Sequence, residues 1–163
     1  MTTATKTVPE GLNISVLART LEEGYGPGAW HGPDLKAAIE DVDPNLAFWR
    51  PAVERHNIAE IALHHAYHLH HVQSRLTGQP ASPFLVAGDD WFALPSAADL
   101  TWAQIQALVE ANHTRVVETV RAIGEGKVTS PLKGEEQFDL VLGITSHAVY
   151  HAGQIQLLKK LAG

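Results

Sequence analysis

Two histidines near the C-terminus have the spacing of a metal-binding pair. His147 and His151 lie four residues apart within the largely apolar run 138–161. On a helix, that spacing places both imidazoles on one face, one turn apart, where they can share a metal ion. The same face is expected to point into the protein because it carries three apolar side chains: Leu140, Ile144 and Leu158.

A pair of imidazoles is an incomplete site. Imidazole suits zinc, nickel, copper or iron, and such an ion needs at least one more ligand from elsewhere in the chain. The alternative is that His147 and His151 are core histidines whose ring nitrogens find protein partners. The chain holds ten histidines, and five of them lie between His64 and His71. The third ligand is therefore sought there first.

The composition excludes several classes of protein and of site. The chain has 163 residues, which suits one domain, and it has no cysteine, which excludes disulfides, thiolate ligands and cysteine nucleophiles. A formal charge of −6 argues against a nucleic-acid surface. No apolar stretch is long enough to span a membrane, and residues 1–7 have no apolar signal core. We therefore expect a cytoplasmic protein with no nucleic-acid or membrane partner.

Helical periodicity predicts an all-α fold with four long helices. They are expected at 9–24, beginning at Pro9, and at 57–76, 101–124 and 136–161, with short helices at 34–40 and 45–49. Capping boxes that begin at Asn57 and Thr101 mark two of the starts. Residues 1–8 are expected to be disordered, and 78–98 and 125–135 to be surface loops, the first pinned by Trp91 and Phe92. Together these elements predict a single four-helix-bundle domain over 1–163.

The helix at 57–76 offers more candidate ligands than a metal needs. His64, His68 and His71 share one face, whereas the apolar stripe of this helix is centred nearer His65. Periodicity alone therefore places His65 deepest in the core and His64 at the margin of the stripe. It does not decide which of these histidines binds a metal.

Three segments of the chain resemble the DinB-like metal-dependent hydrolase superfamily. They are His147-x-x-x-His151-x-Gly153-Gln154, then Asn57-Ile-Ala-Glu60-x-x-x-His64, which is similar to the family's Ser-Ile-x-Glu-x-x-x-His, and Trp30-His31-Gly32-Pro33 followed by Leu35. The resemblance implies a DinB-like four-helix bundle that holds one divalent ion, zinc or nickel. Its ligands would be His64, rather than His65, with His147 and His151.

The resemblance also implies roles for three residues near these ligands. Gly153 is expected where the last helix closely approaches a neighbour, or else is a glycine that the helix simply tolerates. Gln154 is expected to hydrogen-bond a metal-bound water or a ligand imidazole, or else another polar group of the bundle. His31 is expected to line the rim of the pocket or to stabilise its own turn. Gln154 and His31 are thus the candidates for a catalytic role beside the metal ligands.

Three functions fit these residues. Relatives implied by the resemblance transfer groups to low-molecular-weight thiols such as bacillithiol or mycothiol, so the first hypothesis is a metal-dependent S-transferase acting on a thiol and a small electrophile. The second is a hydrolase in which the metal activates water and a carboxylate serves as base. Glu60, one turn from His64, is a candidate for this base, but its place in the capping box favours a structural role instead. The third is a stress-related binding or scaffold protein with a structural metal. A homodimer through the helices at 9–24 and 101–124 is also considered.

Overall fold

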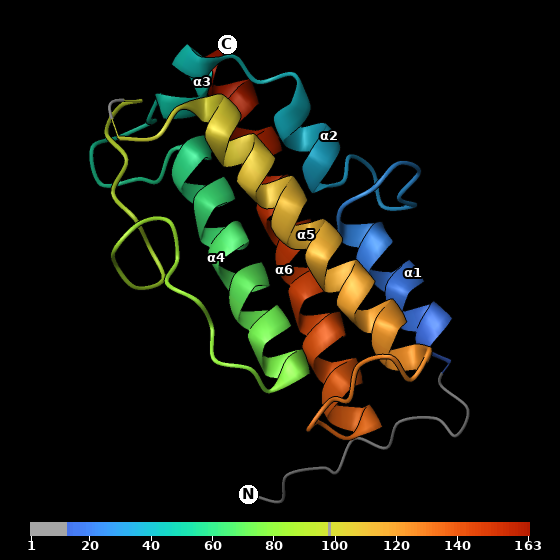
Figure 1. Ribbon diagram of the computed structural model, residues 1–163. Coiled ribbons are helices and arrows are strands. Elements are labelled where there is room, and N and C mark those ends of the chain that lie inside the picture. The colour runs from blue at the N-terminus through green and yellow to red at the C-terminus, as the bar shows by residue number, and fades with distance from the viewer. Residues whose placement is uncertain (1–12, 98) are drawn as a thin grey trace, which may run out of the picture.

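The computed structural model describes residues 13–97 and 99–163, and within them the chain forms six helices and no strand. The four long helices are α1 (Ile14–Gly24), α4 (Ile58–Thr77), α5 (Trp102–Gly124) and α6 (Gly134–Ala162), and the short ones are α2 (Leu35–Glu40) and α3 (Pro44–Phe48). α1 and α4 each pack against both α5 and α6, while α2 packs on α5 and α6 and α3 on α4 (Figure 1). The all-α bundle expected from the sequence is confirmed. Each helix in the described part of the chain is too short or too polar to cross a membrane.

The helix boundaries follow the caps that the sequence predicts. The Asn57 side chain accepts a hydrogen bond from the Glu60 N–H at 2.8 Å, and the Glu60 carboxylate accepts one from the Asn57 N–H. Thr101 and its N3 glutamine form the second capping box, at the start of α5. Gly78, with φ at 69°, ends α4 in the left-handed conformation that glycine adopts easily.

The start of the first helix differs from the prediction. Pro9 and the segment 1–8 lie outside the described residues. The described helix α1 begins at Ile14, after an extended Asn13 whose side chain accepts a hydrogen bond from the Ser15 N–H at 2.9 Å. An asparagine N-cap therefore starts α1 within the stretch where the sequence predicts an uninterrupted helix.

Two buried apolar clusters fill the bundle, and histidines lie where the clusters meet. On α4, the first cluster ends at Ala66 and the second begins at Leu69. On α6, the second cluster ends at Ile144 and the first begins at Ala148. The histidine-rich turns of α4 and α6 therefore form a polar layer between the two halves of the core.

The close approach expected at Gly153 occurs instead at Gly24. A Cβ at Gly153 would meet nothing within 4 Å, so that prediction is wrong. A Cβ at Gly24 would lie 3.0 Å from both the Thr145 carbonyl oxygen and the Ala148 Cβ. The end of α1 thus rests directly on α6, at residues on either side of His147.

Candidate metal centre

The packing of α4 on α6 brings imidazoles from both helices together. The Nε2 atom of His147 lies 3.0 Å from Nε2 of His64 and 3.1 Å from Nε2 of His151. His68 is also close: the ligand atoms of His64, His68 and His147 all lie within 4.8 Å of one another. This three-histidine cluster could hold a metal ion, and His151 adjoins it.

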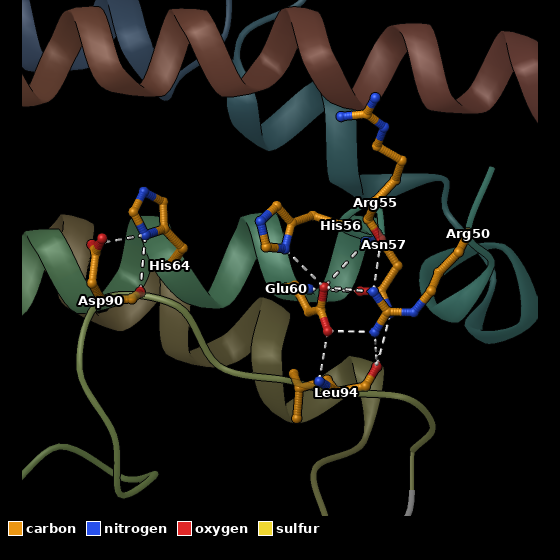
Figure 2. A network of polar contacts seen from close by, with 8 residues as sticks. All are labelled: Arg50, Arg55, His56, Asn57, Glu60, His64, Asp90 and Leu94. Carbon is orange, nitrogen blue, oxygen red and sulfur yellow. Dashed lines mark hydrogen bonds and ion pairs between the residues drawn. The ribbon is translucent and has the colours of Figure 1, made fainter. Parts of the chain in front are cut away.

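The partners of two imidazoles fix which nitrogen carries the proton. Nδ1 of His64 lies 2.9 Å from the backbone carbonyl oxygen of Asp90, which only accepts, so this nitrogen is the donor (Figure 2). Nδ1 of His151 donates in the same way to Oε1 of Gln154 at 2.6 Å. In the neutral rings, Nε2 of both residues is then an unprotonated lone pair. Both lone pairs are directed at Nε2 of His147, an arrangement that a shared cation would satisfy.

The most deeply buried histidine of α4, His65, contacts His147 on the ring nitrogen that does not face His64 and His151. Nδ1 of His65 lies 2.9 Å from Nδ1 of His147, and His65 is 1% exposed against 5% for His64. The apolar stripe therefore predicts correctly that His65 lies deepest. Its other nitrogen, Nε2, is a buried atom without a hydrogen-bond partner among the described residues. His65 thus contacts the cluster through His147.

His68 is turned toward the long loop that precedes α5. Its Nε2 lies 2.7 Å from the carboxylate of Asp90, which is also 3.2 Å from Nδ1 of His64. Asp90 has φ at 64°, an uncommon value for a residue with a side chain, and in this conformation both its carbonyl and its carboxylate face α4. One loop residue therefore orients two of the clustered imidazoles.

Burial favours the neutral form of four imidazoles: His64, His65, His147 and His151. It lowers the pKa of His147 to about 3 and that of His151 to about 4, with repulsion from neighbouring imidazoles adding to the effect at His147. Burial also lowers the pKa of His64, and it lowers that of His65 well below the usual value. Neutral imidazole is the form that binds a metal, so the cluster is ready to act as a ligand at neutral pH.

Trp91 covers the cluster on the side of the loop. Its ring stacks on the His64 ring at 3.8 Å with an interplanar angle of 6°, and on the His56 ring at 3.8 Å and 13°. Phe92 beside it is buried in the first core cluster. The two aromatic residues thus pin the loop, as the sequence predicts, and they also hold Asp90 against α4.

Glu60 is fully engaged in a structural network at the start of α4 (Figure 2). Its carboxylate accepts hydrogen bonds from the Arg50 guanidinium, from the Leu94 N–H at 2.7 Å and from Nδ1 of His56 at 3.1 Å, as well as from the capped N–H of Asn57. Burial alone would raise the pKa of Glu60, but these donors outweigh it and the pKa is lowered. Glu60 therefore acts as a cap and an ion-pair partner, which does not favour a role as general base.

The two residues with predicted secondary roles lie in different surroundings. Gln154 bonds a clustered imidazole, His151, through Oε1 and donates from Nε2 to the Tyr150 hydroxyl at 3.2 Å. His31 is exposed, and its Nε2 lies 2.9 Å from the carbonyl oxygen of Glu23, an arrangement that holds the turn after α1. These contacts match the imidazole-bonding alternative for Gln154 and the turn-stabilising alternative for His31.

Two cavities open on opposite sides of the cluster. One, of about 480 Å³, is lined by His68 and His147 together with charged side chains: Arg75, Glu136 and Asp139. The other, of about 520 Å³, is lined by His151, Gln154 and Trp91, by Arg55 and His56, and otherwise largely by apolar side chains. The imidazoles can therefore be approached from two directions.

A comparison with protein families identifies the fold. The sequence model of the DinB superfamily matches residues 29–155, which include all three segments that carry the resemblance. The chain belongs to the DinB superfamily. No curated protein and no solved structure matches it. The assignment of His64, His147 and His151 as the ligand set in this DinB-like protein stays a prediction.

Sequence reasoning did not find the residues that orient the cluster. Asp90 lies in a loop, 26 positions from His64. The capping box of Asn57 and Glu60 does not indicate that Arg50 and His56 also bind the Glu60 carboxylate. The available signal was the aromatic pair at 91 and 92 in an otherwise polar stretch, which predicts that this loop packs on the body. That signal places the neighbouring aspartate near the helix without showing what it contacts.

Proposed function

We propose that this DinB-like protein is a metal-dependent S-transferase, with one divalent ion, zinc or nickel, held by His64, His147 and His151. The observation that carries the proposal is the meeting of three Nε2 atoms, two of them unprotonated because their rings donate elsewhere from Nδ1. A divalent ion on three imidazoles keeps open positions and supplies Lewis acidity, which lowers the pKa of a thiol or water that it binds.

The reaction joins a low-molecular-weight thiol to a small electrophile. The sulfur forms a bond to carbon, the bond from that carbon to its leaving group breaks, and the thiol proton must be taken up. His68 suits this last role because Asp90 accepts the proton on its Nε2, which leaves Nδ1 free to accept another. The chain has no cysteine, so the nucleophilic sulfur would come from the thiol substrate.

The surroundings of the cluster favour thiol transfer over hydrolysis. The carboxylate that the sequence offers as a base for hydrolysis, Glu60, is occupied by Arg50, His56 and backbone N–H groups, whereas the pair of His68 and Asp90 could take a proton from a thiol or from a water. Two cavities on opposite sides of the cluster suit two substrates that meet at the imidazoles. A stress-related scaffold with a structural metal would need neither cavity.

The test combines metal analysis with a thiol-consumption assay. We expect about one zinc or nickel ion per chain and consumption of thiol with a panel of alkyl halides and epoxides, both lost on substitution of His64 or His151 by alanine. His70→Ala is the matched control, because His70 bonds the Ser82 carbonyl oxygen away from the cluster. Metal-dependent ester cleavage without thiol consumption would favour the hydrolase. A bound metal without either activity would favour the scaffold.

A further inference from the structure

The cavity beside His151 has an unusual combination of a free cation and apolar walls. It is enclosed by the segment that follows α3, by Trp91 and by the C-terminal half of α6. Its volume of about 520 Å³ lies in the range of small-molecule sites. One of the clustered imidazoles lines it, so a ligand in this cavity would lie against the proposed centre.

The cation is Arg55. Among the described residues its guanidinium has no hydrogen-bond or ion-pair partner, whereas the guanidinium of Arg50 nearby is bound to Glu60. Figure 2 shows the Arg55 side chain turned away from that network and toward α6. In the described part of the chain, no acidic residue lines the cavity. An unpaired guanidinium without a competing carboxylate is a recognition group for an anion, above all for a carboxylate.

Most of the rest of the wall is apolar and partly exposed, and its polar side chains are His56, Tyr150, His151 and Gln154. Leu157 and Leu161 on α6 are 58% and 57% exposed. Trp91 is 36% exposed and supplies an aromatic edge, since its two faces stack on His56 and His64. Such side chains at the mouth of a cavity mark a binding surface more often than scattered apolar residues do. Together with Arg55 they form an amphipathic site, with a charged end at the loop and an apolar side along the helix.

The cavity on the other side of the cluster has a different character. There Arg75 shares the lining with Glu136 and Asp139, so positive and negative groups are mixed. A ligand with a single negative charge and an apolar body is matched by the Arg55 cavity and not by this one. Arg75 is therefore a matched control for Arg55, since both arginines line a cavity that adjoins the same cluster.

We propose that the cavity beside His151 binds small carboxylic acids with a largely apolar body, the carboxylate on Arg55 and the body against Trp91 and Leu157. The inference rests on the proposed function in one respect, namely that the electrophilic substrate would enter here, with its reacting carbon directed at His151. The recognition itself depends on Arg55 and the apolar wall, so it can be measured without any turnover.

The test uses 4-phenylbutyrate and its uncharged counterpart 4-phenylbutyramide with the metal-loaded protein. Calorimetry should show the acid binding at least roughly fivefold more tightly than the amide, as expected for a charge-assisted contact near solvent. Arg55→Gln should abolish this preference, and Arg75→Gln should keep it. Among the four indole N–H signals in the NMR spectrum, that of Trp91, assigned with Trp91→Phe, should move on addition of the acid.

Several outcomes would overturn the inference. Equal affinity for acid and amide would do so, as would a preference that survives Arg55→Gln, which would mean that the metal or another group binds the carboxylate. A dimer in sedimentation that excludes the probe, with binding restored when the protein is diluted to the monomer, would assign the surface to a second copy. Metal content is measured on the same samples. If the protein prefers the acid over the amide but holds no metal, only the proposed function is contradicted. If it holds the metal but does not prefer the acid, only the present inference is contradicted.

Discussion

The ligand set can be tested by comparing His151→Ala with His68→Ala. Two overlapping trios share His64 and His147, and they differ in whether His68 or His151 is the third member. His68 donates from Nε2 to the Asp90 carboxylate, so its lone pair is on Nδ1, whereas the lone pair of His151 is on Nε2, 3.1 Å from Nε2 of His147. We therefore expect the loss of His151 to weaken metal binding far more than the loss of His68.

The magnitude follows from what one ligand contributes. Structural zinc sites with four ligands bind with about 10–16 kcal/mol, so one ligand accounts for about 3 kcal/mol, or roughly a hundredfold in affinity. His151→Ala should cost at least that much. Gln154→Ala removes the partner that orients His151 and should cost roughly ten- to a hundredfold. His68→Ala should cost less than about tenfold, since it removes only a neighbour of the site.

The assay is competition for zinc with a chromophoric chelator at fixed pH, with folding of each variant checked by circular dichroism. The expected order of affinity loss is His151→Ala, then Gln154→Ala, then His68→Ala. If His68→Ala lost the metal while His151→Ala kept it, the tautomer argument would be refuted. Equal and large losses would indicate four protein ligands, a closed shell that is typical of a structural site.

Three further predictions concern residues outside the ligand set. Burial and, to a lesser extent, Lys36 lower the pKa of His113 to about 4, so the unfolded state binds an extra proton between that value and about 6.5. Stability is then lost as the pH falls through this window, and His113→Gln should flatten the slope of unfolding free energy by about 1.4 kcal/mol per pH unit in urea titrations. Glu60→Gln should lower that free energy by about 2–3 kcal/mol yet leave metal content unchanged; wild-type stability with loss of all activity would make Glu60 a catalytic base. Gly24→Ala should destabilise the fold by about 1–3 kcal/mol because its Cβ meets α6, whereas Gly153→Ala should be neutral or slightly stabilising in thermal melts.

The fold was predictable because local signals and periodicity agree. The two capping boxes, the glycine after α4 and the apolar stripes place three long helices within about two residues of their observed bounds. The exception is α1, which was expected to begin at Pro9 and which the structure caps at Asn13 instead. Gly153 was misjudged because spacing along one helix does not tell which neighbour lies across from it.

The histidines show where sequence reasoning reaches its limit. Periodicity ranks residues by depth, and it did so correctly for His65 and His64. A ligand, however, is selected by where its lone pair points, and that depends on the partner of the other ring nitrogen. For His64 the partner is the Asp90 carbonyl oxygen, which belongs to a loop with no regular period.

The histidine layer interrupts the apolar packing of the bundle, because it separates the core into two clusters. A bundle of this size gains stability from continuous apolar packing, yet here both clusters stop short of the same turns of α4 and α6. The layer between them buries His65 with an unpartnered nitrogen and directs lone pairs of His64 and His151 at His147. Burying a polar group without a partner costs about 1–3 kcal/mol, and apolar side chains in these positions would remove that cost. A cation bound at the proposed site would satisfy the lone pairs of His64 and His151, and His65 contacts that site through His147. The proposed metal therefore accounts for the layer more readily than the stability of the fold alone does.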